Sequence, residues 1–403
     1  MALIDHDRRP PHHATRPLEA APRAAYIHVP FCRRRCGYCN FTVVAGGDDL
    51  IPRYLDALQV ELQQLGGPHP VETIFLGGGT PSHLGPDDTR RLLQLVRAAF
   101  PLPPGGEWSI EANPEDVTPP RCAAWHEAGV TRVSLGVQSF QPHKLRRLER
   151  HHTAAQVAEA VDTCRRFPFT LSFDLIFGAP NETAATWHAD LEAALRLAPE
   201  HLSVYGLTIE KGSRFYGLVR RHAIEPVAEE TERAMYLDAR STLQRAGYEH
   251  YEISNFARPG HRCRHNESYW LGHSYWAAGP GAASFVDGVY RINHGGTLAW
   301  LGRIEAGRSP VAQEERLDRE AAARLLLVLG LRRLEGVSRS DFRRMTGFDV
   351  ESLAGDVLRD HAAAGWLVQL DDRWQLTEEG ILISDALWPP ILDPPRSPQR
   401  TDR

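Results

Sequence analysis

Six short apolar runs alternate with longer amphipathic segments in the first half of the chain, and this alternation constrains the fold more than any other feature. Helix-length segments such as 52–65 and 86–100, with apolar residues at helical spacing, separate the runs. Such a succession of six β/α units predicts parallel strands joined by right-handed crossovers. The predicted strands are 24–31, 71–76, 108–112, 132–137, 170–177 and 201–207.

Polar or glycine-rich clusters follow nearly every predicted strand. A doubly wound sheet and a barrel both fit six β/α units, but barrel enzymes build one site from many strand ends. We therefore predict an α/β fold with a partial (β/α)6, TIM-like barrel over 24–212. The clusters are 32–39, 77–82, 111–114, 138–140, 174 with 178–180, and 208–210.

Cys32, Cys36 and Cys39 lie in the first of these clusters. A structural zinc site normally has four protein ligands, and no C-x-x-C pair follows later in the chain. Three cysteines on a 4Fe-4S cluster leave one iron open to bind a small molecule and pass it an electron. The spacing favours a cluster, with a zinc loop or unligated thiols as the alternatives, and it resembles the signature of radical S-adenosylmethionine (SAM) enzymes.

The other strand-end clusters contain the groups that a SAM pocket needs. Gly77-Gly-Gly-Thr80 follows a strand and precedes a helix, so its backbone is free to approach a ligand closely. It lacks the spacing of a dinucleotide fingerprint and the lysine of a P-loop. Carboxylate, amide and guanidinium groups for the ribose, amine and carboxylate of SAM come from Glu111, Gln138, Arg150 and Asp174.

A more specific resemblance rests on five ordered motifs, which are Tyr26-Ile-His-Val-Pro-Phe-Cys32, Gly-Gly-Gly-Thr-Pro-Ser82, Glu111-Ala-Asn-Pro, Leu135-Gly-Val-Gln-Ser-Phe and Asp174-Leu-Ile-Phe-Gly-Ala-Pro. Over residues 26–387 the chain resembles the oxygen-independent coproporphyrinogen oxidase family of radical SAM proteins. The resemblance implies that Cys32, Cys36 and Cys39 hold a 4Fe-4S cluster. It also implies SAM contacts from Tyr26, Gly78, Gly79, Thr80, Glu111, Gln138, Arg150, Asp174 and Thr208.

The residue two positions after the third cysteine divides this family. Decarboxylating oxidases resemble C-x-x-x-C-x-x-C-x-C, whereas this chain has Phe41 at the last position. Together with His265-Asn-Glu-Ser-Tyr-Trp270, this resembles the haem chaperone branch. That branch implies haem as cargo and acceptor haemoproteins as partners, membrane-bound respiratory enzymes among them.

His265 is the haem contact that we predict, because an imidazole is a common axial ligand and Tyr269 and Trp270 offer flat apolar faces. The alternative is a packing motif in which His265 is hydrogen-bonded and Trp270 lies in the core. Cys263 is a rival thiolate ligand, although an isolated cysteine is more often packed or free.

Two other functions stay open at this point. One is oxidative decarboxylation of coproporphyrinogen III, against which Phe41 counts. The other is a zinc-loop protein with a winged-helix nucleic-acid module, which the net charge of −5 disfavours. We therefore expect no nucleic-acid partner. A homodimer is among the oligomeric states left open.

The remaining segments predict a lid and a second domain. A lid or connecting region over 213–316 starts with a helix near 228–246, and the Gly-, His-, Tyr- and Trp-rich segment 248–291 is expected to form irregular loops. Helices and a strand pair over 317–388 predict a mainly helical, winged-helix-like domain. Residues 1–23 and 389–403 are expected to be disordered tails.

Six cysteines without a disulfide framework predict a reducing compartment. No apolar run of about 18 residues occurs and no secretion signal is evident at the start, so we expect a cytoplasmic protein. Transfer of haem to membrane-bound acceptors would bring it to the membrane as a peripheral protein.

Overall fold

The six predicted strands form the parallel centre of a twelve-stranded sheet. The computed structural model describes residues 21–393, so most of the two predicted tails lies outside the described residues. The central order β1-β4-β5-β6-β7-β8 follows the sequence, with each neighbouring pair parallel. The central strands are β1 (Ala24–Val29), β4 (Thr73–Gly78), β5 (Glu107–Ala112), β6 (Arg132–Gln138), β7 (Thr170–Phe177) and β8 (His201–Gly206).

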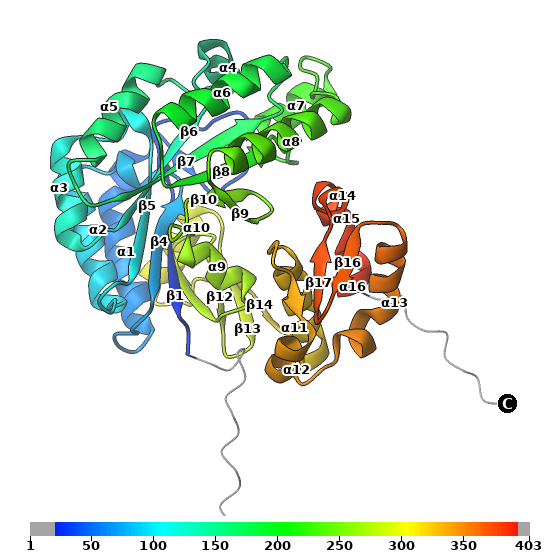
Figure 1. Ribbon diagram of the computed structural model, residues 1–403. Helices are drawn as coiled ribbons and strands as arrows, with labels where there is room; N and C mark the ends of the chain where they lie inside the picture. Colours follow the sequence, from blue (N-terminus) through cyan, green and yellow to red (C-terminus); the bar gives the residue numbers. More distant parts are fainter. Residues whose placement is uncertain (1–20, 394–403) are drawn as a thin grey trace, which may run out of the picture.

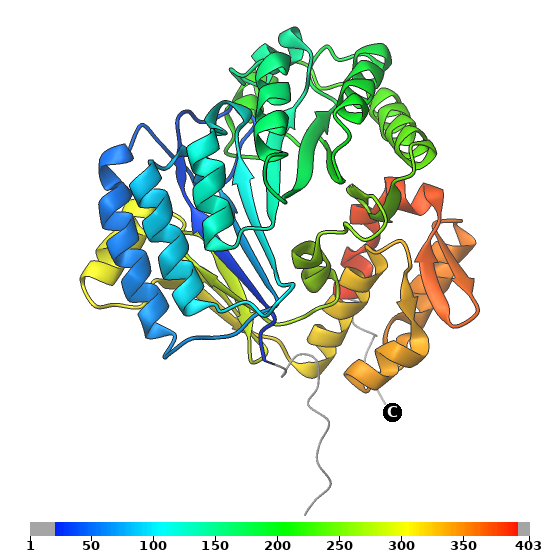
Figure 2. The same cartoon turned by 60° about the vertical axis from the view of Figure 1, so that its left-hand side comes forward.

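Six helices connect these strands and cover the outer face of the curved sheet (Figures 1 and 2). They are α1 (Ile51–Gln64), α2 (Pro86–Ala99), α3 (Pro119–Ala128), α4 (Pro142–Arg147), α5 (Ala154–Cys164) and α6 (Ala184–Arg196). Apolar residues on one side of each helix pack against the sheet, as Tyr54, Leu55, Leu58 and Leu62 of α1 do. The partial barrel predicted from the alternation is confirmed.

The region after residue 213 differs from the prediction, because it extends both edges of the sheet. β10 pairs antiparallel with β8, and β11 pairs parallel with β1. The expectation of irregular loops over 248–291 is therefore wrong. The elements are α7 (Arg214–Arg220), α8 (Glu229–Arg245), β9 (Glu249–Glu252), β10 (Asn255–Ala257), α9 (Arg264–Trp270), β11 (Tyr275–Ala278), β12 (Ala283–Val286), β13 (Val289–Asn293), α10 (Thr297–Glu305) and β14 (Val311–Arg316).

A smaller C-terminal domain, orange to red in Figure 1, has the element order of a winged helix. Its three-stranded antiparallel sheet has the order β15-β17-β16. The elements are α11 (Arg319–Leu331), β15 (Val337–Ser338), α12 (Arg339–Thr346), α13 (Val350–Ala363), β16 (Leu367–Leu370), β17 (Arg373–Leu376), α14 (Glu378–Leu382), α15 (Ser384–Leu387) and α16 (Pro389–Leu392).

The start predicted for the C-terminal tail, residue 389, is wrong because α16 packs onto this domain. Ile391 is fully buried, and its carbonyl oxygen accepts a hydrogen bond from Arg324 Nη1 at 3.1 Å. Among the described helices, none is long and apolar enough to cross a membrane.

Candidate functional site

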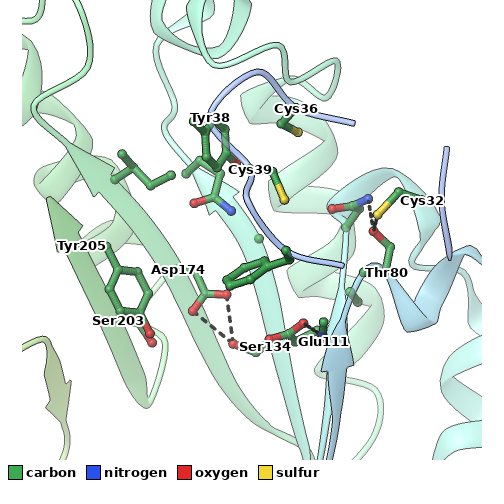
Figure 3. Close-up of a pocket in the computed structure, with 18 of the residues that line it drawn as sticks. Cys32, Cys36, Tyr38, Cys39, Thr80, Glu111, Ser134, Asp174, Ser203 and Tyr205 are labelled. Atoms are coloured by element: carbon green, nitrogen blue, oxygen red, sulfur yellow. Dashed lines mark hydrogen bonds between the residues drawn. The ribbon is translucent and has the colours of Figure 1, made fainter. Parts of the chain in front are cut away.

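One cavity of about 880 Å³ runs through the barrel, and the residues predicted from the sequence to hold the cluster, to contact SAM or to bind the haem iron all line it. Trp270, predicted as a flat face for the porphyrin, is not among the residues that line it. This volume lies within the range of small-molecule and cofactor sites. The cluster and SAM residues come from the strands β1, β4, β5, β6 and β7 and from segments that follow the strands up to β8, because the carboxyl ends of parallel strands meet at one edge. His265 comes from α9. Figure 3 shows the cysteine loop above Glu111 and Asp174.

The cysteine loop is closed at its base by a short parallel pair, β2 (Phe31–Cys32) and β3 (Val44–Ala45). All three cysteines are free and partly exposed. Cys32 Sγ lies 3.3 Å from Thr80 Oγ1, which connects the loop to the end of β4. Burial raises the pKa of the Cys32 thiol to about 11 despite the contact with Thr80.

These thiols fit a 4Fe-4S cluster. Each cysteine of such a site binds a different iron, so the three sulfurs need to face one cavity without converging on a single ion. Cys32, Cys36 and Cys39 all line the same cavity, as this arrangement requires. Arg150 Nη1 lies 3.9 Å from Cys36 Sγ and supplies positive charge beside the thiols.

The glycine turn at the end of β4 lies directly against the end of β1. Gly78 has a φ of 100°, and a Cβ there would lie 2.3 Å from the His28 ring. A Cβ on Gly79 would lie 2.6 Å from the carbonyl oxygen of Val29. Glycine is required at both positions, and the turn exposes backbone to the cavity.

Glu111 and Asp174 are two carboxyl groups inside the barrel with raised pKa values. Glu111 Oε2 accepts the Gly78 N–H at 3.0 Å, and both oxygens of Asp174 accept from Ser134 Oγ at 3.3 Å. Burial raises the pKa of Glu111 to about 8, the charge of Asp174 adds to this rise, and the Gly78 N–H opposes it. Burial also raises the pKa of Asp174 to about 6.

Arg150 is the cation of this set. Its Nη2 donates to Gly136 O at 2.9 Å and to Asn113 Oδ1. A Cβ on Gly136 would lie 3.2 Å from Gln138 Nε2 and 3.4 Å from Arg150 Nη2. The amide of Gln138 and the guanidinium group therefore lie side by side on the cavity wall.

Sequence reasoning missed the serines that project inward from the strands. Ser134 on β6 hydrogen-bonds Asp174, while Ser172 and Ser203 also line the cavity. Their only signal is a small polar residue inside an otherwise apolar strand. Tyr26 also lines the cavity from inside a strand, with its ring stacked on Phe75 at 6.2 Å.

His265 lies at the opposite end of the barrel from the cysteine loop. Its Nδ1 lies 3.0 Å from the hydroxyl of Thr73, the first residue of β4, and its Nε2 lies 2.8 Å from Tyr269 OH. The side chain is 1% exposed, and burial lowers the pKa of the imidazole to about 3. Both nitrogens are engaged, as the packing alternative expects, and this disfavours an axial-ligand role. Trp270, which that alternative places in the core, is partly exposed.

Cys263 is similarly enclosed. It is 3% exposed, its Sγ lies 3.6 Å from Glu107 Oε1, and burial raises the pKa of its thiol. Phe41, in contrast, lines the cavity near the cysteine loop and is 68% exposed.

Comparisons with known proteins agree with this geometry. The model of the radical SAM superfamily matches residues 26–194, and the model of the HemN C-terminal domain matches residues 317–383. The coproporphyrinogen III oxidase HemN of Escherichia coli, described as a radical SAM enzyme, superposes with a TM-score of 0.81 at 20% identity, covering 93% of this chain and 90% of HemN. Fold and site thus define a radical SAM protein with a HemN-like architecture.

Full-length relatives identify the branch. The heme chaperone HemW of Bacillus subtilis is 32% identical over 92% of this chain and 99% of that protein. HemW of Mycobacterium tuberculosis H37Rv is 37% identical over 92% of this chain and 95% of that protein. Mouse radical S-adenosyl methionine domain-containing protein 1, mitochondrial, is 33% identical over 92% of this chain and 88% of that protein. The chain belongs to the HemW family.

Proposed function

We propose that this protein is a haem chaperone that binds a 4Fe-4S cluster, SAM and haem, and that transfers haem to acceptor haemoproteins. The observation that carries the proposal is the three-cysteine loop over a cavity lined by Gly78, Glu111 and Asp174, in a chain of the HemW family. Cys32, Cys36 and Cys39 hold the cluster. When bound, the cluster supplies one-electron chemistry at its open iron.

The chain's own residues bind and orient SAM. Gly78, Gly79 and Thr80 present backbone groups to its amino acid end, and Arg150 pairs with its carboxylate. Glu111, Asp174 and Gln138 hydrogen-bond its amine and ribose hydroxyls. Tyr26 and Thr208 complete the walls of the site.

Haem handling is supported by the name that the relatives carry and by Phe41. We infer that membrane-bound respiratory enzymes are among the acceptors, and delivery to them would bring this cytoplasmic protein to the membrane surface.

A haem titration of the anaerobically reconstituted protein tests whether it binds haem and whether His265 is a haem ligand. We expect saturable binding of about one haem per chain in wild type and in His265→Ala, because His265 Nδ1 and Nε2 already have partners. Loss of haem binding in a folded His265→Ala variant would establish the imidazole as ligand and contradict this expectation.

A turnover assay distinguishes the chaperone from the oxidase. We expect no protoporphyrinogen when the reduced, reconstituted protein is incubated with SAM and coproporphyrinogen III, because Phe41 replaces the cysteine of the oxidases. Substantial product would overturn the chaperone-only function.

A further inference from the structure

The last residue of β6 adopts a strained backbone. Gln138 has a φ of 61°, and the Ser139 N–H donates to Val137 O at 2.7 Å. This is a γ-turn with a positive φ at its centre, the rare form that a non-glycine residue adopts only when its surroundings enforce it. The pairing register of β6 and β7 shifts between Leu135 and Gln138 at the same place.

Strand alternation brings Gln138 to the cavity, and the turn fixes where its amide lies. Arg132, Ser134 and Gly136, at the alternate positions before it on β6, also line the cavity. The turn ends the strand at Gln138 and holds its amide beside Arg150 in the cavity wall.

Asp190 of α6 holds this turn from the outside of the barrel. One carboxylate oxygen accepts the Phe140 N–H at 2.7 Å, and the other accepts from Ser139 Oγ at 2.7 Å. Asp190 is fully buried, so both bonds form away from water.

A buried lysine connects this carboxylate to the next strand end. Lys144 Nζ lies 3.0 Å from Asp190 Oδ2 and also donates to Glu182 Oε1. Glu182 Oε2 accepts the N–H of Ala179, in the loop after β7, at 2.9 Å. Lys144 and Glu182 are also buried, so one network ties the ends of β6 and β7 together.

Buried ion networks of this kind seldom add stability over apolar side chains of similar size, because desolvation offsets the attraction. What an apolar replacement does not supply is an acceptor for Ser139 and Phe140 at the strained turn. We infer that Asp190, Lys144 and Glu182 are positioning residues that hold the Gln138 turn and so place Gln138 and Arg150 to bind SAM. That this ligand is SAM rests on the proposed function.

SAM affinity of the reconstituted protein tests the inference. Asp190→Asn is expected to weaken SAM binding about tenfold or more, while iron content and haem stoichiometry stay unchanged. Ser139→Ala removes the hydrogen bond to Asp190 and the one that Ser139 Oγ accepts from the Gln141 N–H, and it leaves all charges in place. It is expected to weaken SAM binding about threefold. If Asp190→Asn does not fold, Ser139→Ala still decides.

Thr183→Ala is the matched control. Thr183 is the N-cap of the helix that carries Asp190 and lies outside the network, so its loss weakens the helix without touching the turn. SAM affinity like that of wild type is expected. Equal weakening in Thr183→Ala and Asp190→Asn would assign the effect to general destabilisation and overturn the inference.

A double-mutant cycle makes the test specific for the turn. Glycine adopts a positive φ without strain, so Asp190→Asn should have little further effect on SAM affinity in a Gln138→Gly background. The same fold-loss in both backgrounds would contradict a role through Gln138.

Hydrogen exchange tests the turn without SAM. The amides of Ser139 and Phe140 should exchange faster in Asp190→Asn than in wild type or Thr183→Ala. Unchanged exchange in Asp190→Asn would overturn the inference. A wild-type protein that fails to bind SAM would refute the proposed function, but the exchange rates of the variants could still be compared.

Discussion

Cys36 and Glu111 show how the site depends on single side chains. Cys36 lies between the other two cysteines on a loop that crosses the cavity, and Arg150 is its polar neighbour. Glu111 lies inside the barrel next to a second carboxyl group, with the Gly78 N–H as a hydrogen-bond donor. The first side chain is suited to bind metal and the second to be protonated near neutral pH.

Cys36→Ala should abolish cluster binding, because two remaining thiolates do not hold a 4Fe-4S cluster. Iron and sulfide analysis after anaerobic reconstitution measures this loss. Cys122→Ala, at a buried cysteine outside the cavity, is the control and should retain a full cluster. Equal iron content in the two variants would contradict the assignment.

Glu111 should make the protein without cofactors less stable as the pH rises. Its folded-state pKa of about 8 exceeds the ordinary carboxyl value, so the folded state binds more protons and its stability falls between about pH 4.5 and pH 8. Urea unfolding measures the free energy of unfolding across that pH window. For Glu111→Gln this free energy should fall less than for wild type, by about 1–3 kcal/mol. Parallel curves for variant and wild type would contradict this account.

At the scale of elements, Glu61 on α1 connects the central strands to the region after residue 213. Its buried carboxyl group accepts from Gly279 N at 2.9 Å, Asn293 Nδ2 at 2.6 Å and Trp300 Nε1 at 3.2 Å. These donors lie after β11, on β13 and on α10, so one side chain fastens three segments.

Glu61→Ala should lower the free energy of unfolding by about 3 kcal/mol, because it leaves three buried donors without their acceptor. Urea denaturation measures the loss. Val60→Ala, on the exposed side of the same helix, should change it by less than about 0.5 kcal/mol. Similar losses in the two variants would show that the three bonds do not matter.

The sequence predicted the central strands well and the later ones poorly, for a physical reason. β4 and β7 are mostly buried, and each contains a run of three apolar residues, 74–76 and 175–177, that marks it locally. β10 and β11 have three and four residues and exist because they pair with β8 and β1, which no local pattern encodes.

Local patterns also explain which residues around the site could be predicted and which could not. Glu111 and Asp174 could be predicted because parallel strands bring their ends together. The contacts of Lys144 with Glu182 and Asp190 span 38 and 46 residues, and no motif marks them.

At the scale of the whole molecule, α9 lies between the barrel and the C-terminal domain. His265 points toward β4, while the ring of Trp270 lies 4.8 Å from the guanidinium of Arg332, just after α11. Arg262 pairs with Glu335 at 2.5 Å across the same boundary. The segment predicted as a haem site thus joins the two domains.

A second contact joins the domains near the barrel mouth. Arg233 of α8 forms two hydrogen bonds with Glu379 of α14, at 2.8 and 2.6 Å, and Arg240 pairs with Glu378 at 2.9 Å. Glu232 on the same helix lies against Gly178 and Gly206, beside the ends of β7 and β8. The C-terminal domain therefore contacts the helix that borders the proposed SAM and cluster site.

Haem transfer tests the central claim most directly. The protein is reconstituted anaerobically, loaded with haem, freed of excess haem and mixed with an apo-haemoprotein, and the absorbance spectrum of the acceptor is followed. We predict that haem moves from this protein to the acceptor and that the acceptor gains its holo spectrum. A protein that retains no haem, or that retains haem and delivers none, would contradict the chaperone function.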